Sequence, residues 1–120
     1  MVYASTSLAS AAVELFVHLE PNQAPRDLVS IAAELSEGEP SQHWERDTLP
    51  AEWSSDELGP LRAKGDAWIR SQGSLAVQVP SVPISLEWNV LINPLHARIH
   101  ELSIKAADPF HFDASMFQGR

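Results

Sequence analysis

The sequence predicts one α+β domain, because two stretches with helical periodicity accompany several short stretches that alternate like strands. Apolar residues recur every three or four positions within Met1–Glu20 and again within Leu61–Gln72, which Gly73 should end, and this spacing is typical of helices. Ser74–Val79 alternates with a period of two, and the short apolar run Val90–Ile92 indicates another strand. A chain of 120 residues suffices for one hydrophobic core, so we expect one domain.

The N-terminal helix is expected to begin after a run of hydroxyl side chains and to end before Pro21. Ser5, Thr6 and Ser7 can each accept a hydrogen bond from the free N–H groups of a first helical turn. Apolar residues lie on nearly all sides of the helix, so it is predicted to be buried. One carboxylate, Glu14, stands among them.

Glu14 has two interpretations. In the first, it lies on a narrow solvent-exposed stripe with Ser10 and His18, its neighbours at i−4 and i+4, because charged side chains are seldom buried without a partner. In the second, it lines a cleft, where other polar groups must offset the hydration that an ionised carboxylate loses. Periodicity alone favours the first interpretation and leaves the second open.

The remaining segments predict strands and one long loop. Leu28–Leu35 alternates with a period of two and is predicted to be a strand, although its composition also suits a helix. Ser36–Pro60 is rich in Glu, Ser, Asp and Pro, and we expect a loop with short turns that Trp44 and Trp53 hold in place. Weak alternation across Glu101–Phe112 predicts one or two closing strands.

Composition excludes several classes of protein. Sixteen acidic residues against eight Lys and Arg give a formal charge of −8, which argues against direct binding of nucleic acid through its phosphates. Without cysteine the chain forms neither disulfides nor thiolate metal sites. No apolar run approaches the roughly 18 residues of a membrane span. We therefore expect a cytoplasmic protein without membrane contact.

Ser81 is the serine that the sequence singles out. Pro80 and Pro83 stiffen the backbone around it, and the predicted strand before it should hold its hydroxyl at a strand end, where binding groups often collect. It lacks the Gly-x-Ser-x-Gly elbow of many serine hydrolases, so that chemistry is weakly supported.

His96 and His100 are spaced like a helical metal pair, but zinc sites usually recruit three or four well-placed ligands and no carboxylate motif accompanies these two. We expect a structural or exposed pair and no metal. A Gly-rich phosphate loop is also absent from the sequence, which has five scattered glycines.

Three blocks of the sequence together resemble the RES-domain toxins of RES–Xre toxin–antitoxin systems. The blocks are MVYASTSLASAAVELFVHLE at 1–20, LAVQVPSVPISLEWNVLINPLH at 75–96 and PFHFDASMF at 109–117. The residues that match the family pattern are Tyr3, Glu14, Ser81, Trp88, Asn89, Asn93 and His96. The family's Arg block, which precedes the Tyr, has no counterpart in residues 1–120, so we expect an N-terminally shortened RES-like domain over this range.

The resemblance implies a fold like that of the ADP-ribosyltransferase toxins, with a cleft for NAD as substrate. It implies cleavage of the nicotinamide–ribose bond by hydrolysis, or by phosphorolysis with inorganic phosphate as co-substrate, and protein ADP-ribosylation as an alternative. Glu14 would stabilise the ribose cation that forms as this bond breaks. Tyr3 would stack on the nicotinamide or position the ribose, and Ser81 would bind a phosphate or the carboxamide. Asn89 would contact substrate.

The resemblance also implies an Xre-type antitoxin as partner, and we expect an oligomer or a complex. A second possibility is a catalytically inactive or truncated module that still binds the antitoxin. Since the phosphate-binding Arg is missing, we expect little NAD cleavage from these residues alone unless Arg62, Arg70 or Arg98 performs its role.

Overall fold

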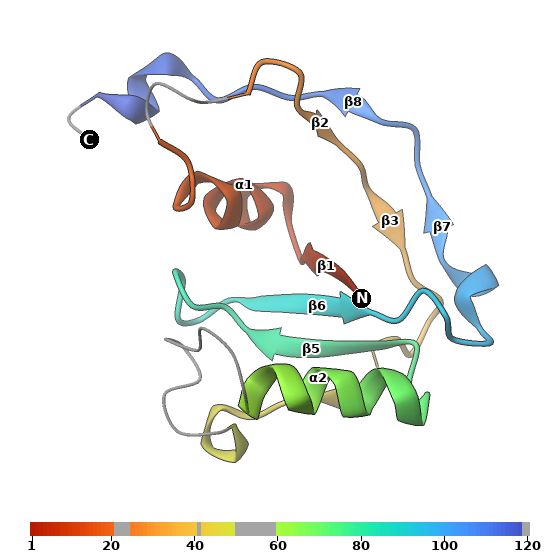
Figure 1. Ribbon diagram of the computed structural model, residues 1–120. Helices are drawn as coiled ribbons and strands as arrows, with labels where there is room; N and C mark the ends of the chain where they lie inside the picture. The colour runs from red at the N-terminus through yellow and green to blue at the C-terminus, as the bar shows by residue number, and fades with distance from the viewer. Residues whose placement is uncertain (21–24, 41, 50–59, 119–120) are drawn as a thin grey trace.

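A sheet of four strands forms the centre of the molecule (Figure 1). The computed structural model describes residues 1–20, 25–40, 42–49 and 60–118. The described strands are β1 Val2–Ser5, β2 Val29–Ser30, β3 Ala33–Glu34, β4 Gln42–His43, β5 Ala76–Pro80, β6 Trp88–Ile92, β7 Ser103–Ile104 and β8 Asp108–Pro109. The described helices are α1 Leu8–Phe16 and α2 Pro60–Ser71, with short 3-10 turns η1 Arg46–Thr48, η3 Ile99–Glu101 and η4 Ala114–Phe117.

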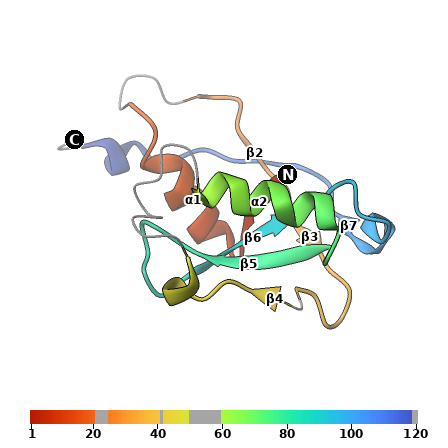
Figure 2. The same ribbon diagram turned by 60° about the horizontal axis from the view of Figure 1, so that its bottom comes forward.

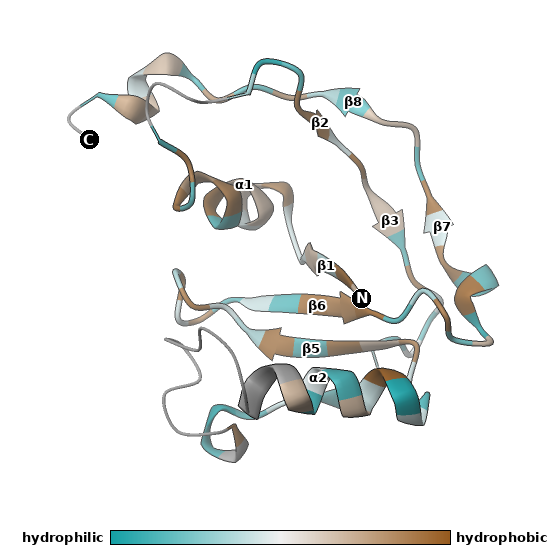
Figure 3. Ribbon diagram, in the orientation of Figure 1, coloured by the Kyte–Doolittle hydropathy of each residue, from teal (hydrophilic) through white to brown (hydrophobic). Residues whose placement is uncertain are grey.

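The central sheet has the strand order β1-β6-β5-β4. β6 pairs antiparallel with β1 on one side and with β5 on the other, whereas β4 runs parallel to β5. β5 and β6 occupy the middle and are hydrophobic along most of their length (Figure 3). The two strands predicted from alternation and from the short apolar run are therefore confirmed, and they are the buried centre of the fold.

Helix α2 covers one face of this sheet. Trp68 packs against Val77, Val79 and Leu91, which point to the same face because side chains alternate along each strand. The Trp68 indole Nε1–H also donates a 2.9 Å hydrogen bond to Ser74 Oγ, so the ring is fixed at both its apolar and its polar side.

The end of α2 lies one residue earlier than predicted. The helix stops at Ser71, and Gln72 takes the left-handed conformation at φ 52°. Gly73 was expected to end the helix, but the residue that turns the chain is Gln72, although glycine usually occupies such a position.

A second hydrophobic cluster lies on the opposite face of the sheet. Ala76, Val90 and Ile92 are buried there, and Leu35 and Leu102 pack against them. Because the two clusters use alternate residues of the same strands, the sheet is apolar on both sides, which explains why its central strands read as nearly continuous apolar runs.

The prediction that the N-terminal helix is buried was wrong. α1 ends at Phe16, and within it Ser10 is buried, whereas Leu8 and Leu15 are exposed. The helix faces the sheet with one side only, so apolar residues on its other sides stay at the surface. Its start was predicted correctly in part, because Ser7 caps it by accepting a 3.1 Å hydrogen bond from the Ser10 N–H.

A two-stranded ribbon extends from the sheet and curves past β1 and α1 (Figures 1 and 2). Its ladders pair β2 with β8 and β3 with β7, and Lys105 N–H donates to Ala32 O at 2.8 Å between them. The strand predicted over Leu28–Leu35 is thus extended but interrupted. Val29 and Ile31 are exposed, so the alternation there does not mark a buried face.

The segment predicted as a long loop contains β4 and η1. Trp44 packs against the cluster around Trp68, as expected of an aromatic that holds a loop in place, and Lys64 Nζ lies 4.8 Å from the centre of its ring. Trp53 lies outside the described residues. The predicted closing strands are confirmed as β7 and β8.

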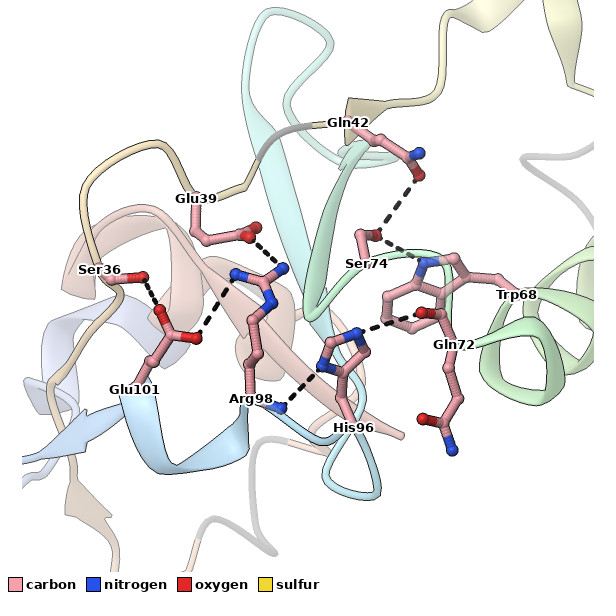
Figure 4. Close-up of polar contacts among 9 residues, drawn as sticks. All are labelled: Ser36, Glu39, Gln42, Trp68, Gln72, Ser74, His96, Arg98 and Glu101. Carbon is pink, nitrogen blue, oxygen red and sulfur yellow. Dashed lines mark hydrogen bonds and ion pairs between the residues drawn. The ribbon is translucent and has the colours of Figure 1, made fainter.

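Polar contacts tie the beginning of this loop to the segment after β6 (Figure 4). Arg98 Nη2 donates to Glu39 Oε1 at 2.6 Å, and its Nη1 lies 3.5 Å from Glu101 Oε2. Ser36 Oγ donates to Glu101 Oε1 at 3.1 Å.

Within the described part of the chain, no helix is long and apolar enough to cross a membrane.

Candidate functional site

The carboxylate of Glu14 is held by two side chains from the central sheet. Its Oε1 atom accepts a hydrogen bond of 2.6 Å from Asn89 Nδ2 and one of 2.9 Å from Ser81 Oγ. Asn89 and Ser81 are almost completely buried, with 0% and 1% of their surfaces exposed. Bonds from such fixed donors to an ionised acceptor are stronger than those between neutral groups, and they offset the hydration that the carboxylate loses.

The register of the sheet brings these donors together. Asn89 stands opposite Val79 of β5, so Ser81 follows two residues beyond that pair, where β5 has just ended. Asn89 and Leu91 alternate with Val90, so Asn89 faces the side of the sheet that α2 covers. Glu14 of α1 therefore meets the sheet on the same face as Trp68 of α2.

A tight loop fixes the Ser81 hydroxyl. Ser81 N–H donates to Glu87 O at 3.0 Å, and Glu87 N–H donates to Ile84 O at 3.0 Å. The hydroxyl oxygen accepts a hydrogen bond of 3.3 Å from Ile84 N–H while its own hydrogen is directed at Glu14. Arg46 of η1 further donates to Ser85 O in this loop. The position expected for Ser81, a rigid turn at a strand end, is thus the one observed.

Tyr3 joins the same network through Asn89. Its hydroxyl oxygen accepts a hydrogen bond of 2.8 Å from Asn89 Nδ2, while its ring lies largely at the surface. Burial of the hydroxyl raises the pKa of Tyr3 above its usual value, and the nearby Glu14 carboxylate raises it further, whereas the Asn89 bond opposes them. The phenol is therefore neutral at physiological pH.

Ser5 also belongs to this network, although it was not predicted from the sequence to be a site residue. Its Oγ atom donates a hydrogen bond of 2.8 Å to Asn89 Oδ1. It was considered only as one of three possible caps for the helix. The spacing of two between Tyr3 and Ser5 in a strand was the available signal, since it places both side chains on one face.

One oxygen of Glu14 remains for other partners. Both hydrogen bonds described above end on Oε1, and no residue in the described ranges donates to Oε2. Glu14 as a whole is half-buried. The solvent stripe expected of Ser10, Glu14 and His18 is wrong for Ser10, which is buried, whereas Glu14 is partly exposed and His18 is exposed.

Other residues singled out by the sequence lie elsewhere. His96 is buried and its Nε2 lies 3.1 Å from Gln72 O, while Nδ1 accepts a hydrogen bond from Arg98 N–H (Figure 4). His100 is exposed, so the two histidines do not face a common ligand. Among the described residues, no group of three or more His, Asp and Glu side chains could hold a metal ion.

Two of the three arginines considered for phosphate binding, Arg70 and Arg98, are not part of the Glu14 network. Arg98 is engaged with Glu39 and Glu101 beyond the far end of β6, and these carboxylates hold its pKa above the usual value. Arg70 is exposed near the end of α2. The side chain of Arg62 lies outside what the structure describes.

These contacts define a small mixed α/β domain built around one carboxylate that is held against the sheet. The chain belongs to the RES domain family, whose model matches residues 1–113. This finding confirms the resemblance seen in the three sequence blocks.

Relatives of this chain carry toxin names. It is 30% identical over 121 residues to the Prs ADP-ribosylating toxin of Sphingobium sp. (strain YBL2), covering 98% of this chain and 75% of that protein. It is 25% identical over 122 residues to Toxin Res of Photorhabdus laumondii, covering 99% and 77%. A Toxin Res of Yersinia enterocolitica is 25% identical over 116 residues, covering 92% and 72%. The chain is therefore similar to RES-family toxins along most of their length.

Proposed function

We propose that this protein is a toxin that degrades NAD by cleaving the bond between nicotinamide and ribose. The observation that supports this most directly is the Glu14 carboxylate, which Ser81 and Asn89 hold through Oε1 while Oε2 receives no hydrogen bond from the described residues. A fixed carboxylate with one oxygen that receives no donor from the described residues suits the stabilisation of positive charge on a substrate.

The proposed reaction breaks the bond between nicotinamide nitrogen and ribose C1′. The bonding electron pair leaves with the nicotinamide ring, which becomes neutral, and positive charge develops on the ribose. Glu14 Oε2 would lie against this cationic sugar or accept a hydrogen bond from one of its hydroxyls, and either contact strengthens as the charge grows. Water then bonds to C1′ and releases a proton, which yields ADP-ribose. With inorganic phosphate in place of water, the product is the sugar 1-phosphate.

The network assigns supporting roles to the other residues. Tyr3 has its hydroxyl within the network and its ring at the surface, so the ring can stack on a flat group such as nicotinamide. Ser81 directs its hydroxyl hydrogen at Glu14, so we propose that it orients this carboxylate. Donation to a phosphate, one of the roles first expected, would require that bond to break, whereas its oxygen could still accept a hydrogen bond from a carboxamide N–H.

Asn89 also supports the site indirectly in this proposal. It is completely buried, and its Nδ2 atom already donates to Glu14 and Tyr3. Its influence on substrate would therefore pass through these two residues. Direct contact between Asn89 and substrate, as the family pattern suggests, stays a prediction.

A second candidate reaction is transfer of ADP-ribose to a protein. It is favoured by the relative at 30% identity, which is named an ADP-ribosylating toxin. The bond-breaking step is the same, and a nucleophilic side chain of the target protein attacks C1′ in place of water. An ADP-ribosyltransferase-like fold would serve both reactions, and we propose that the domain has such a fold.

We further propose a protein partner of the Xre antitoxin class that covers this site. The site is rich in acceptor oxygens and the chain has a formal charge of −8, so an Arg or Lys of the partner could reach Glu14 as a cationic substrate would. The proposal of this partner rests on membership of the RES family and on the negative charge of the chain.

The product of the reaction tests the proposed function. The protein, expressed from the full reading frame that contains these residues, is incubated with NAD in the presence and absence of inorganic phosphate. Release of free nicotinamide is the expected result. With NAD that is labelled in its ADP-ribose part, the second product identifies the acceptor. ADP-ribose indicates water, the sugar 1-phosphate indicates phosphate, and labelled protein indicates an amino-acid side chain. A folded protein that releases no nicotinamide under any of these conditions would contradict the proposal and favour the non-catalytic module.

A further inference from the structure

Buried Asn89 lies at the centre of the network, and the orientation of its side-chain amide decides whether the hydrogen bonds to Glu14, Tyr3 and Ser5 can form. Its Nδ2 atom must face Glu14 and Tyr3, at 2.6 and 2.8 Å, for both of its N–H groups to be used. Rotation of the side-chain amide by a half turn would instead direct Oδ1 at the Glu14 carboxylate, where two oxygen acceptors would repel each other.

Ser5 supplies the partner for the other end of this amide. Its Oγ–H donates to Asn89 Oδ1 at 2.8 Å, so every polar atom of the carboxamide has a described partner. The contact follows from strand pairing, because Ser5 of β1 stands directly opposite Asn89 of β6. Tyr3, two residues earlier on β1, reaches the same amide diagonally. One short strand thus positions both side chains.

We infer that Ser5 is a positioning residue, which holds the Asn89 carboxamide so that its N–H groups fix the Glu14 carboxylate and the Tyr3 hydroxyl. Without the Ser5 hydroxyl, Asn89 Oδ1 would be a buried acceptor that lacks its donor, and the amide would lose the bond that opposes its rotation. The expected effect on catalysis by Glu14 rests on the proposed function, whereas the expected effects on the Asn89 amide and the Tyr3 hydroxyl do not.

Tyr3 provides a spectroscopic readout because it is the only tyrosine in the chain. The Asn89 N–H stabilises the phenolate, so a loosened amide should raise the Tyr3 pKa further. We expect Ser5→Ala to shift the ultraviolet titration of tyrosinate to higher pH than in the wild type. Ser5→Thr, which keeps a hydroxyl, should restore it. Thr6→Ala is the matched control, since the Thr6 hydroxyl bonds to Trp88 O and not to the network.

Exchange of the Asn89 side-chain amide protons provides a second readout near neutral pH. Loss of one supporting hydrogen bond should speed their exchange roughly tenfold in Ser5→Ala, measured by NMR on labelled protein. Ser5→Cys, a weak donor of similar size, replaces Ser5→Ala if the alanine variant does not fold, as judged by circular dichroism. It should give a smaller change in the same direction.

NAD cleavage completes the experiment and separates the two proposals. If Ser5 positions Glu14 through Asn89, Ser5→Ala should lower kcat about tenfold with little change in KM. A folded Ser5→Ala or Ser5→Cys protein with unchanged Tyr3 titration and unchanged Asn89 exchange would overturn the inference even if NAD is cleaved. If the wild type does not cleave NAD, the proposed function fails, and the Tyr3 and Asn89 measurements still decide the role of Ser5.

Discussion

Ser81 donates a 2.9 Å hydrogen bond to the Glu14 carboxylate, although 67 positions separate the two residues in the chain. Glu14 comes from the first helix and Ser81 from the end of β5, and Asn89 of β6 donates to the same oxygen. The carboxylate is therefore fixed by the central, most buried part of the sheet. Such support from rigid elements is what a catalytic group requires.

Ser81→Ala should weaken NAD cleavage without abolishing it. The variant loses one hydrogen bond to a charged acceptor, which is worth about 1.5–3 kcal/mol. This corresponds to a loss in kcat/KM of roughly tenfold to hundredfold, measured by steady-state kinetics. Unchanged kinetics combined with a lower Tm would mean that Ser81 is only a turn residue.

The Tyr3 hydroxyl should make the protein less stable at high pH. Its pKa is raised in the folded state above the value of about 10 that it has when unfolded. Below that pH the phenol is protonated in both the folded and the unfolded state, so Tyr3 does not make the free energy of unfolding depend on pH. As the pH rises towards the folded-state pKa, the unfolded state loses its proton first, so the free energy of unfolding falls.

Denaturation with urea at about pH 9 and about pH 11 measures this effect. The wild type should lose more stability between the two values than Tyr3→Phe, which has no proton to lose. An equal loss in both proteins would show that Tyr3 does not contribute to the pH dependence.

Trp68→Ala should destabilise the fold strongly. The side chain is 7% exposed, fills the space between α2 and the sheet, and bonds to Ser74. Removing a large aromatic from such a position costs about 3–5 kcal/mol in the free energy of unfolding. Urea denaturation checks this value, with exposed Leu95→Ala as a control that should change little. Similar stability of the two variants would contradict the described packing.

Prediction from sequence succeeded where side chains are buried on a regular pattern. β5, β6 and α2 were located because Val77, Leu91 and Trp68 belong to the core and impose their period on the sequence. The helix α1 was located as well, but its expected burial was wrong, and the strand predicted over Leu28–Leu35 is interrupted. Apolar residues such as Leu8 and Ile31 are exposed there, so their pattern does not report burial.

Glu14 and Ser81 were singled out from the sequence pattern itself, but only the family resemblance predicted that they share a site with Tyr3 and Asn89. Tyr3, Glu14, Ser81 and Asn89 were named from matching motifs, and the structure brings them together. Periodicity favoured a solvent-facing Glu14, because the donors that satisfy this carboxylate lie 67 and 75 positions away and depend on strand register. Local pattern carries no information on such pairings.

The exposed apolar side chains predict association. Hydrophobic surface is exposed at Val2 of the edge strand β1, at Leu8 of α1, and at Val29 and Ile104 of the ribbon. Such surface favours protein contacts. Light scattering after size exclusion should therefore detect an oligomer, or a complex when an Xre-type partner is co-expressed. A stable monomer that does not bind such a partner would contradict this expectation.

The most direct test compares Glu14→Gln with wild type in the release of nicotinamide from NAD. The substitution keeps the size and one acceptor oxygen but removes the negative charge, and the matched control is Glu20→Gln, an exposed carboxylate close by in the sequence. Our account predicts a fall of at least roughly hundredfold for Glu14→Gln and none for Glu20→Gln, with both proteins folded. Release at the wild-type rate by folded Glu14→Gln would contradict the catalytic role of Glu14.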